Sequence, residues 1–118
     1  MNQYDEALSC CREERYAEAI LIFQALADQG HAEAQTKLGI CYASGRGIVR
    51  DEAVAVEWFR KAAVQGHADA QYKLGYYYEN GLVVTQNYAK AVELYRKAAE
   101  QGDADARERL DDLRDKQD

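Results

Sequence analysis

Apolar residues recur at every fourth position over long stretches of the chain, which is the spacing of one face of an α-helix. Ala34, Leu38 and Tyr42 form one such stripe, and the same positions 36 residues later form a second one. The chain contains no proline, and glycines mark the ends of the periodic segments. This pattern predicts an all-α protein built from short helices.

The helical pattern is an internal repeat. Gly30, Gly66 and Gly102 are 36 residues apart, and each follows a glutamine. When residues 30–65 are laid over residues 66–101 without a gap, 19 of the 36 positions are identical. A period of this length is typical of proteins in which similar units stack on one another.

The sequence predicts two helices in each unit. Gly45 ends the first helix of one unit, because glycine accepts the left-handed conformation that follows a helix end. A loop then leads to Asp51, whose side chain is suited to cap the second helix; Gly81 and Asn87 occupy these places in the next unit. Gly39 lies inside the first helix and predicts close approach of the second helix, which we expect to involve alanine pairs such as 62–63.

The ends of the chain complete the stack. We expect a shorter first unit over residues 1–29, with a first helix at Gln3–Arg12, two full units over 30–65 and 66–101, and a capping helix over 102–118. The last segment turns polar, as the end of a stack requires. The predicted fold is therefore a single all-α, right-handed superhelix (solenoid) of about seven helices.

Charge and composition restrict the function. A formal net charge of −6 argues against nucleic-acid binding, which needs a basic face. By segment the charge is −4, +1, 0 and −3, so the acidic ends would also favour a basic partner. The sequence shows neither an apolar run that could span a membrane nor a signal peptide, and this predicts a cytoplasmic protein. An odd number of cysteines predicts reduced thiols.

No group of side chains predicts catalysis. His31 and His67 occupy the same repeat position, about 10 Å apart if the units stack as packed helices do, which is too far for one metal ion. Both are better explained as helix starts. Cys10, Cys11 and Cys41 lack both the spacing of a zinc site and an activating partner. We therefore expect no enzyme activity, no metal and no cofactor.

The repeats resemble a known family, the Sel-1-like repeats, which are relatives of the tetratricopeptide repeat with a longer loop between the helices. The resemblance rests on Ala-x-Ala-Gln-x-x-Leu-Gly-x-x-Tyr-x-x-Gly at 32–45 and 68–81, followed by Trp-Phe-Arg-Lys-Ala-Ala at 58–63 and its second copy. It implies an α-solenoid that binds protein partners on its concave side, without catalysis. One departure concerns the loop, where Val83-Val84 replaces Gly47-Ile48.

In such a fold the first helices line the groove. Two residues along a helix correspond to a rotation of about 200°, which turns the side chain at 72 away from the core position at 70. The residues that we predict to bind a partner are Tyr4, Leu8, Thr36, Lys37, Ile40, Tyr72, Lys73, Tyr76 and Glu79. Tyr72 and Tyr76 are the expected anchors, whereas Tyr78 belongs to the core stripe and Tyr77 packs between units.

Two functions follow from this interpretation. The first is a non-catalytic adaptor that holds a peptide or a helix of a partner protein in its groove. The alternative is an immunity or inhibitor protein that neutralises a specific enzyme or toxin. Weak self-association, or exposed tyrosines without a role, are further explanations for Tyr72 and Tyr76.

Overall fold

The computed structural model describes residues 2–117 and, within them, shows seven α-helices and no strand. This confirms the predicted all-α fold and the first helix at Gln3–Arg12. The helices are α1 (Gln3–Arg12), α2 (Tyr16–Asp28), α3 (Ala32–Ser44), α4 (Glu52–Val64), α5 (Ala68–Asn80), α6 (Tyr88–Glu100) and α7 (Ala104–Gln117). None of these helices combines the length and the apolar character needed to cross a bilayer.

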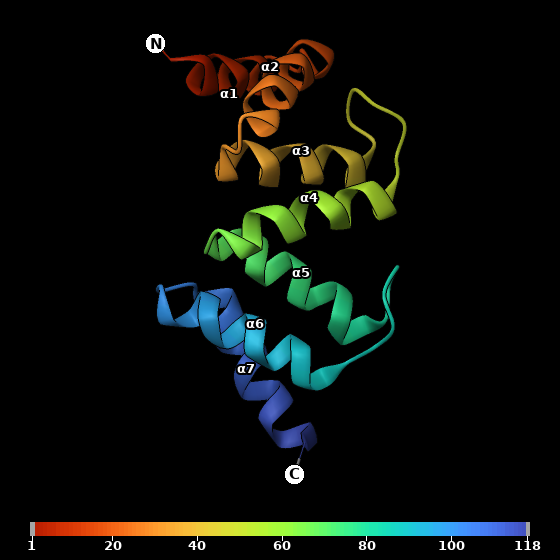
Figure 1. Cartoon of the computed structure of the whole chain (residues 1–118), viewed down its shortest axis with the longest axis vertical. Helices are drawn as coiled ribbons and strands as arrows, with labels where there is room; N and C mark the ends of the chain where they lie inside the picture. The colour runs from red at the N-terminus through yellow and green to blue at the C-terminus, as the bar shows by residue number, and fades with distance from the viewer. Residues whose placement is uncertain (1, 118) are drawn as a thin grey trace.

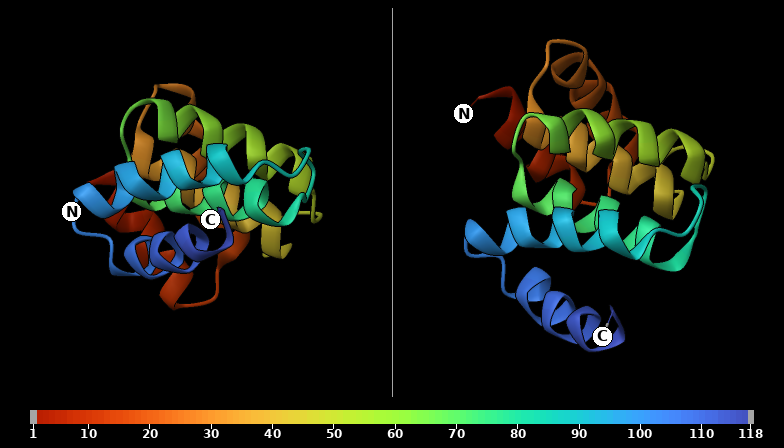
Figure 2. Two further views of the ribbon diagram at one scale, coloured as in Figure 1. Left: turned by 90° about the horizontal axis from the view of Figure 1, so that it is seen from below. Right: turned by 60° about the horizontal axis from the view of Figure 1, so that its bottom comes forward.

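The helices stack one after another along the long axis of the molecule, which measures 47 × 27 × 24 Å (Figure 1). Every helix packs on the helices before and after it in the chain. The N-terminus lies at one end of the stack and the C-terminus at the other, and the two long loops, α3–α4 and α5–α6, lie along the same edge (Figures 1 and 2). The chain is therefore a solenoid whose odd-numbered helices form one face.

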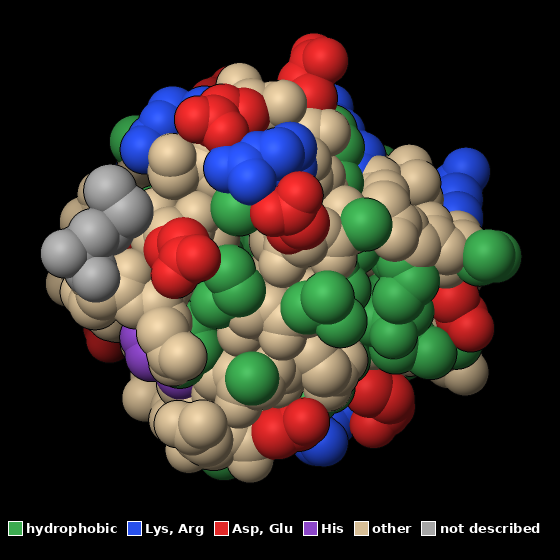
Figure 3. All heavy atoms as spheres, turned by 90° about the horizontal axis from the view of Figure 1, so that it is seen from above, with side chains coloured by type: hydrophobic (Ala, Val, Ile, Leu, Met, Phe, Trp, Pro, Cys, Tyr) green, Lys and Arg blue, Asp and Glu red, His purple; other side chains and the backbone are tan. Residues whose placement is uncertain are grey.

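Hydrophobic side chains are exposed at the N-terminal end of this stack. Figure 3 looks onto that end and shows hydrophobic groups between acidic and basic ones. On α2, the side chain of Leu21 is 74% exposed, and Ala25, one turn later, is also exposed. The same two repeat positions of α4 carry the charged residues Glu57 and Lys61. The outer side of α2 is thus apolar where that of α4 is charged.

Side chains and glycines fix the helix ends as the sequence predicts. Asp51 accepts a hydrogen bond from the Val54 backbone N–H (3.2 Å), and Asn87 caps α6 in the same way. Gly45 follows α3 with a left-handed φ of 74°. The turn after α1 has the same left-handed form, but there Glu14 adopts a φ of 61° without the freedom of glycine.

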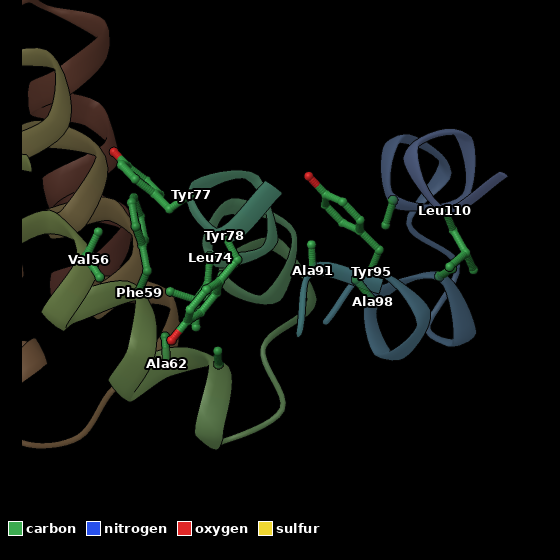
Figure 4. Packing of buried hydrophobic residues seen from close by; sticks show 14 of the residues in the cluster. Val56, Phe59, Ala62, Leu74, Tyr77, Tyr78, Ala91, Tyr95, Ala98 and Leu110 are labelled. Carbon is green, nitrogen blue, oxygen red and sulfur yellow. The ribbon is translucent and has the colours of Figure 1, made fainter. Parts of the chain in front are cut away.

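The core lies between the two helices of each unit and between neighbouring units. Figure 4 shows Phe59 of α4 beside Tyr77 and Tyr78 of α5, and Tyr95 of α6 beside Leu110 of α7. All five side chains are buried, which confirms the predicted positions of Tyr77 and Tyr78. On α7 the buried side chains are Ala106, Leu110 and Leu113, and most of the others face solvent.

The glycines inside the first helices allow an aromatic ring to approach. A Cβ atom on Gly39 would lie 2.7 Å from the ring of Phe59, and one on Gly75 would lie 2.8 Å from the ring of Tyr95. The predicted close approach is therefore confirmed, but its expected cause is wrong. The rings of Phe59 and Tyr95 occupy the space, and the alanine pair at 62–63 does not.

Two buried glutamines, Gln35 and Gln71, bind both within their own unit and to the unit before it. The Gln65 side-chain amide donates to Oε1 of Gln35 (2.9 Å), and Gln101 donates to Gln71 in the same way (2.9 Å). Gln35 in turn donates to the Ala27 carbonyl of the preceding unit. Gln71 donates to the Ala63 carbonyl of its preceding unit in the same way, so this bond to a backbone carbonyl recurs after 36 residues and links one unit to the next.

The loops differ at one repeat position. Gly47 has a left-handed φ of 74° and lies so close to the backbone of Tyr16 that an added Cβ would meet it at 2.8 Å. Val83 occupies the same repeat position with a φ of 66°. The two loops therefore share a left-handed φ at this position, although only one of them has the glycine that suits it.

Candidate partner-binding groove

A hollow of about 380 Å³ lies between α3 and α5, on the face formed by the odd-numbered helices. Its lining residues are Ile40, Ala43, Ser44, Phe59, Tyr72, Lys73, Tyr76 and Tyr77. We call it hollow A. Its floor is the buried ring of Phe59, and its walls are largely apolar, so it could accept a hydrophobic side chain.

A second hollow, hollow B, of about 270 Å³, lies between α1 and α3. Its lining residues are Leu8, Cys11, Arg12, Tyr16, Phe23, Lys37, Ile40, Cys41, Ser44 and Arg46. Ile40 and Ser44 line both hollows, so the two are adjacent. Together they form one groove that runs from α1 across α3 to α5.

The two predicted anchor tyrosines lie in the wall of hollow A. Tyr76 is 48% exposed and meets the ring of Tyr77 edge-on, with ring centroids 6.1 Å apart. Tyr72 is half-buried against Tyr95, with centroids 5.7 Å apart, and this burial raises the pKa of its hydroxyl. Tyr76 is therefore the more accessible of the two, and Tyr72 is held in place by packing.

A partly buried ion pair lies beyond hollow A, between α5 and α7. The Glu79 carboxylate accepts hydrogen bonds from the Tyr95 hydroxyl (2.8 Å) and from the Arg109 guanidinium of α7. The prediction that Glu79 lies on the open face is wrong, because the residue is only 6% exposed and is held by these partners. The same positions one unit earlier are Ala43, Phe59 and Lys73, and they leave hollow A open.

Thr36 also lies elsewhere than predicted. It is buried, its hydroxyl donates to the Ala32 carbonyl (3.1 Å), and its Oγ1 atom is 2.9 Å from Nδ1 of His67. The prediction that it faces the groove is therefore wrong. His31 caps α3 by accepting from the Ala34 N–H, as expected, whereas His67 precedes α5 but makes no such cap and binds Thr36 instead.

The remaining predicted residues divide into two groups. Leu8, Lys37, Ile40 and Lys73 line the groove together with the two anchor tyrosines. Tyr4 lines neither hollow, because it stacks on His31 at a centroid distance of 5.1 Å. Burial and the neighbouring Glu33 raise the pKa of Tyr4 to about 12.

Several groove residues were missed by the sequence interpretation. Phe59 belongs to a second helix, and only the glycine at 39 signals that its ring reaches through to the first-helix face. Arg46 comes from the α3–α4 loop, and its guanidinium lies over the Tyr16 ring at 5.6 Å. Arg12 ends α1. The angular position opposite the core stripe identifies only one side of each first helix. Residues of the second helices, of the loops and of the helix ends therefore could not be found in this way.

The groove contains two cysteines with free thiols. Among the residues that the structure describes, no group of three His, Cys, Asp or Glu side chains could hold a metal ion. Cys11 and Cys41 line hollow B, and burial raises the pKa of Cys41 to about 11 and that of Cys11 above its ordinary value. Such thiols stay protonated near neutral pH and are poor nucleophiles.

Comparisons with known proteins agree with this architecture. The chain is 41% identical to a Sel1 repeat protein from Oxalobacter formigenes over 80% of its own length, with a TM-score of 0.77. It is 38% identical to c5321, a protective antigen of uropathogenic Escherichia coli strains with an SLR fold, over 88% of its length (TM-score 0.83). It is 25% identical to the cysteine-rich protein B of Helicobacter pylori over 75% of its length (TM-score 0.71).

These relatives differ in length. The chain covers 39% of the Oxalobacter protein, 23% of c5321 and 67% of the Helicobacter protein. No curated protein matches the chain.

The family model for the Sel1 repeat matches residues 32–67 and 68–103. These matches have the period of the predicted units, although they begin two residues later; the division at 29, 65 and 101 stays a prediction. Sel1 repeats generally serve as non-catalytic modules for protein–protein interaction. With two matched repeats that span more than half of its residues, the chain belongs to the Sel1 repeat family.

Proposed function

We propose that this protein is a non-catalytic adaptor that holds a segment of a partner protein in the groove formed by α1, α3 and α5. The observation that supports the proposal is the pair of adjacent hollows, A and B, on one face of the stack. Neither hollow is covered by another part of the described chain. The cytoplasmic location stays a prediction.

The groove has the features of a peptide-binding surface. Its floor consists of buried residues such as Phe59, so its shape is set before a partner arrives, and binding orders few protein side chains. Tyr76 at the rim offers a large contact surface with few rotatable bonds. A partner side chain in hollow A would be surrounded by aromatic rings, which is typical of the centre of an interface.

The experiment compares variants of one exposed tyrosine in the groove and one outside it. Tyr76 is 48% exposed, and Tyr88, at the start of α6, is 36% exposed and lines neither hollow. Proteins from a lysate of the native source would be captured on wild type, Tyr76→Lys and Tyr88→Lys. The proposal predicts a protein that wild type and Tyr88→Lys retain and Tyr76→Lys loses. Identical sets on all three would contradict it.

The alternative function, in which this protein inhibits a specific enzyme or toxin, stays a prediction. It would use the same groove to bind that enzyme or toxin. If the captured protein is an enzyme, its activity should fall when wild type is added and should persist with Tyr76→Lys. If wild type does not change the activity, inhibition is refuted and the adaptor role remains as the only proposed use of the groove.

Weak self-association is a second candidate, and the apolar outer side of α2 favours it. Leu21 is 74% exposed there, whereas the same position of α6 is Glu93, which pairs with Lys97 (3.3 Å). An antiparallel pair of α2 helices would bury Leu21 against its own copy. Sedimentation velocity should show a dimer at high concentration that Leu21→Lys abolishes, and a monomer at all concentrations would refute this.

A further inference from the structure

We propose that the groove selects an acidic segment, in which apolar side chains enter hollows A and B and neighbouring Asp or Glu carboxylates meet basic groups on the walls. This inference rests on the proposed function and adds the chemistry of the partner. It differs from the expectation given by the whole chain, whose acidic ends would favour a basic partner.

The charges along the groove are all of one sign. Hollow B is lined by Arg12, Lys37 and Arg46, hollow A is lined by Lys73, and no aspartate or glutamate lines either one. The chain as a whole has 15 basic and 21 acidic residues. The walls of the groove therefore have a charge opposite to that of the whole protein, which is what electrostatic selection of an acidic partner requires.

These basic groups have little internal compensation. Among the described residues, Arg12, Lys37 and Arg46 form no ion pair, and Lys73 has only a long contact of 3.9 Å with Asp69. Some other basic residues are closely paired; Arg15, for example, lies 2.6 Å from Glu13. Because the groove cations are beside apolar walls, their attraction for a carboxylate is less screened than on an open surface.

The thiols in hollow B do not reverse this charge. Burial raises the pKa of Cys11 and Cys41, so both are neutral near pH 7 and add no negative charge beside Lys37. Hollow B therefore presents three cations and uncharged walls to a ligand.

The acidic preference ends at α7. There the Glu79 carboxylate already binds Arg109, which also contacts Asp112 (3.1 Å), and Glu108 is exposed nearby in the sequence. Repulsion from these carboxylates would keep an acidic segment on the α1–α5 part of the groove. The acidic residues of the partner should thus lie over α1 and α3, with an apolar residue beside Tyr76.

The test is a selection from a random 12-residue peptide library displayed on phage, with wild-type protein as the target and prior removal of binders to Tyr76→Lys. The enriched peptides are then synthesised with a fluorophore, and their dissociation constants are measured by anisotropy. Lys37→Glu/Lys73→Glu is the groove variant. Lys61→Glu/Lys97→Glu is the control, since it makes the same charge change on α4 and α6, away from both hollows.

We expect enriched peptides that combine apolar residues with a net negative charge. Their dissociation constant should rise roughly 10-fold or more with the groove variant and less than about 2-fold with the control. It should also rise when NaCl is increased from 50 to 500 mM. Circular dichroism of both variants checks that they fold as wild type does.

The failures can be told apart. Enriched peptides that are neutral or basic, and bind the groove variant as tightly as wild type, would overturn the acidic preference and leave the groove function intact. An absence of peptides that depend on Tyr76 would overturn both proposals. Tighter binding of labelled oligo-dT12 than of any peptide, lost in the groove variant, would overturn the acidic peptide in favour of a nucleic acid.

Discussion

Exchanging one residue between the two long loops should change stability in opposite directions. Val83 has a φ of 66°, and the Val84 N–H donates to the Leu82 carbonyl across it (2.6 Å), which makes a γ-turn in its strained form. Its side chain is 54% exposed, so it contributes little burial. Gly47 has a similar left-handed φ of 74° at the same repeat position of the other loop, but there the glycine packs directly against the backbone of Tyr16.

The expected sizes follow from this packing. A β-branched residue in the left-handed region costs about 1–2 kcal/mol, and glycine loses about 0.5–1 kcal/mol through the entropy of the unfolded chain. Val83→Gly should therefore stabilise the fold by about 1 kcal/mol, or about 4 °C in Tm for a chain of this size. Gly47→Val adds the same strain and places a Cβ 2.8 Å from Tyr16, so it should cost about 3 kcal/mol or more.

Urea unfolding followed by circular dichroism measures both changes, provided that the m-values stay equal. Val83→Ala serves as a control, because it shortens the side chain but keeps a Cβ in the left-handed region and should gain much less than glycine does. A Val83→Gly variant that is less stable than wild type would refute the reasoning. So would a Gly47→Val variant of unchanged stability.

Four further changes should have measurable effects. Glu14→Gly should raise the free energy of unfolding by about 0.5–1 kcal/mol, since Glu14 has a left-handed φ of 61° after α1; a loss in urea unfolding would contradict this. Arg109→Ala should cost about 2–4 kcal/mol, because it leaves the Glu79 carboxylate buried with only Tyr95 as its partner. The triple change Glu79→Ala, Tyr95→Phe and Arg109→Lys copies the residues of the preceding unit and removes the buried carboxylate, so it should cost less than Arg109→Ala. A loss of stability equal to or greater than that of Arg109→Ala would contradict this explanation. Burial and the nearby Glu52 raise the pKa of Tyr77 from 10.0 to about 12. Because folded Tyr77 keeps a proton that the unfolded chain loses, this residue should contribute a fall in stability of about 1.4 kcal/mol per pH unit between pH 10 and 12, and Tyr77→Phe should remove that share of the slope in urea titrations.

Much of the fold could be predicted because the helix boundaries of each repeat are determined by residues close to them in the sequence. Glycines with a left-handed φ end the helices, and Asp51 and Asn87 begin the second ones, so each boundary depends on residues within a few positions of it. The similarity of the two units, with 19 of 36 positions identical, then indicates that the same packing occurs twice. This is why the burial of Tyr77 and Tyr78 could be inferred from alignment alone.

The groove was harder to predict, because its details depend on contacts far apart in the sequence. Glu79 meets Arg109, 30 residues later, and Thr36 meets His67, 31 residues later. Angular position on one helix does not reveal such partners, because each first helix is packed on more than one side. A comparison of units gives the best signal: Glu79 replaces Ala43 where Arg109 replaces Lys73, and this paired change marks an interaction in one unit only.

The most direct test of the groove is a map of where a selected peptide binds. The peptide is titrated into ¹⁵N-labelled protein, and changes in the backbone amide chemical shifts are followed residue by residue. The account predicts that the largest changes occur in α1, α3 and α5, around Lys37, Ile40 and Tyr76. Changes confined to α2, α4 and α6 would contradict it.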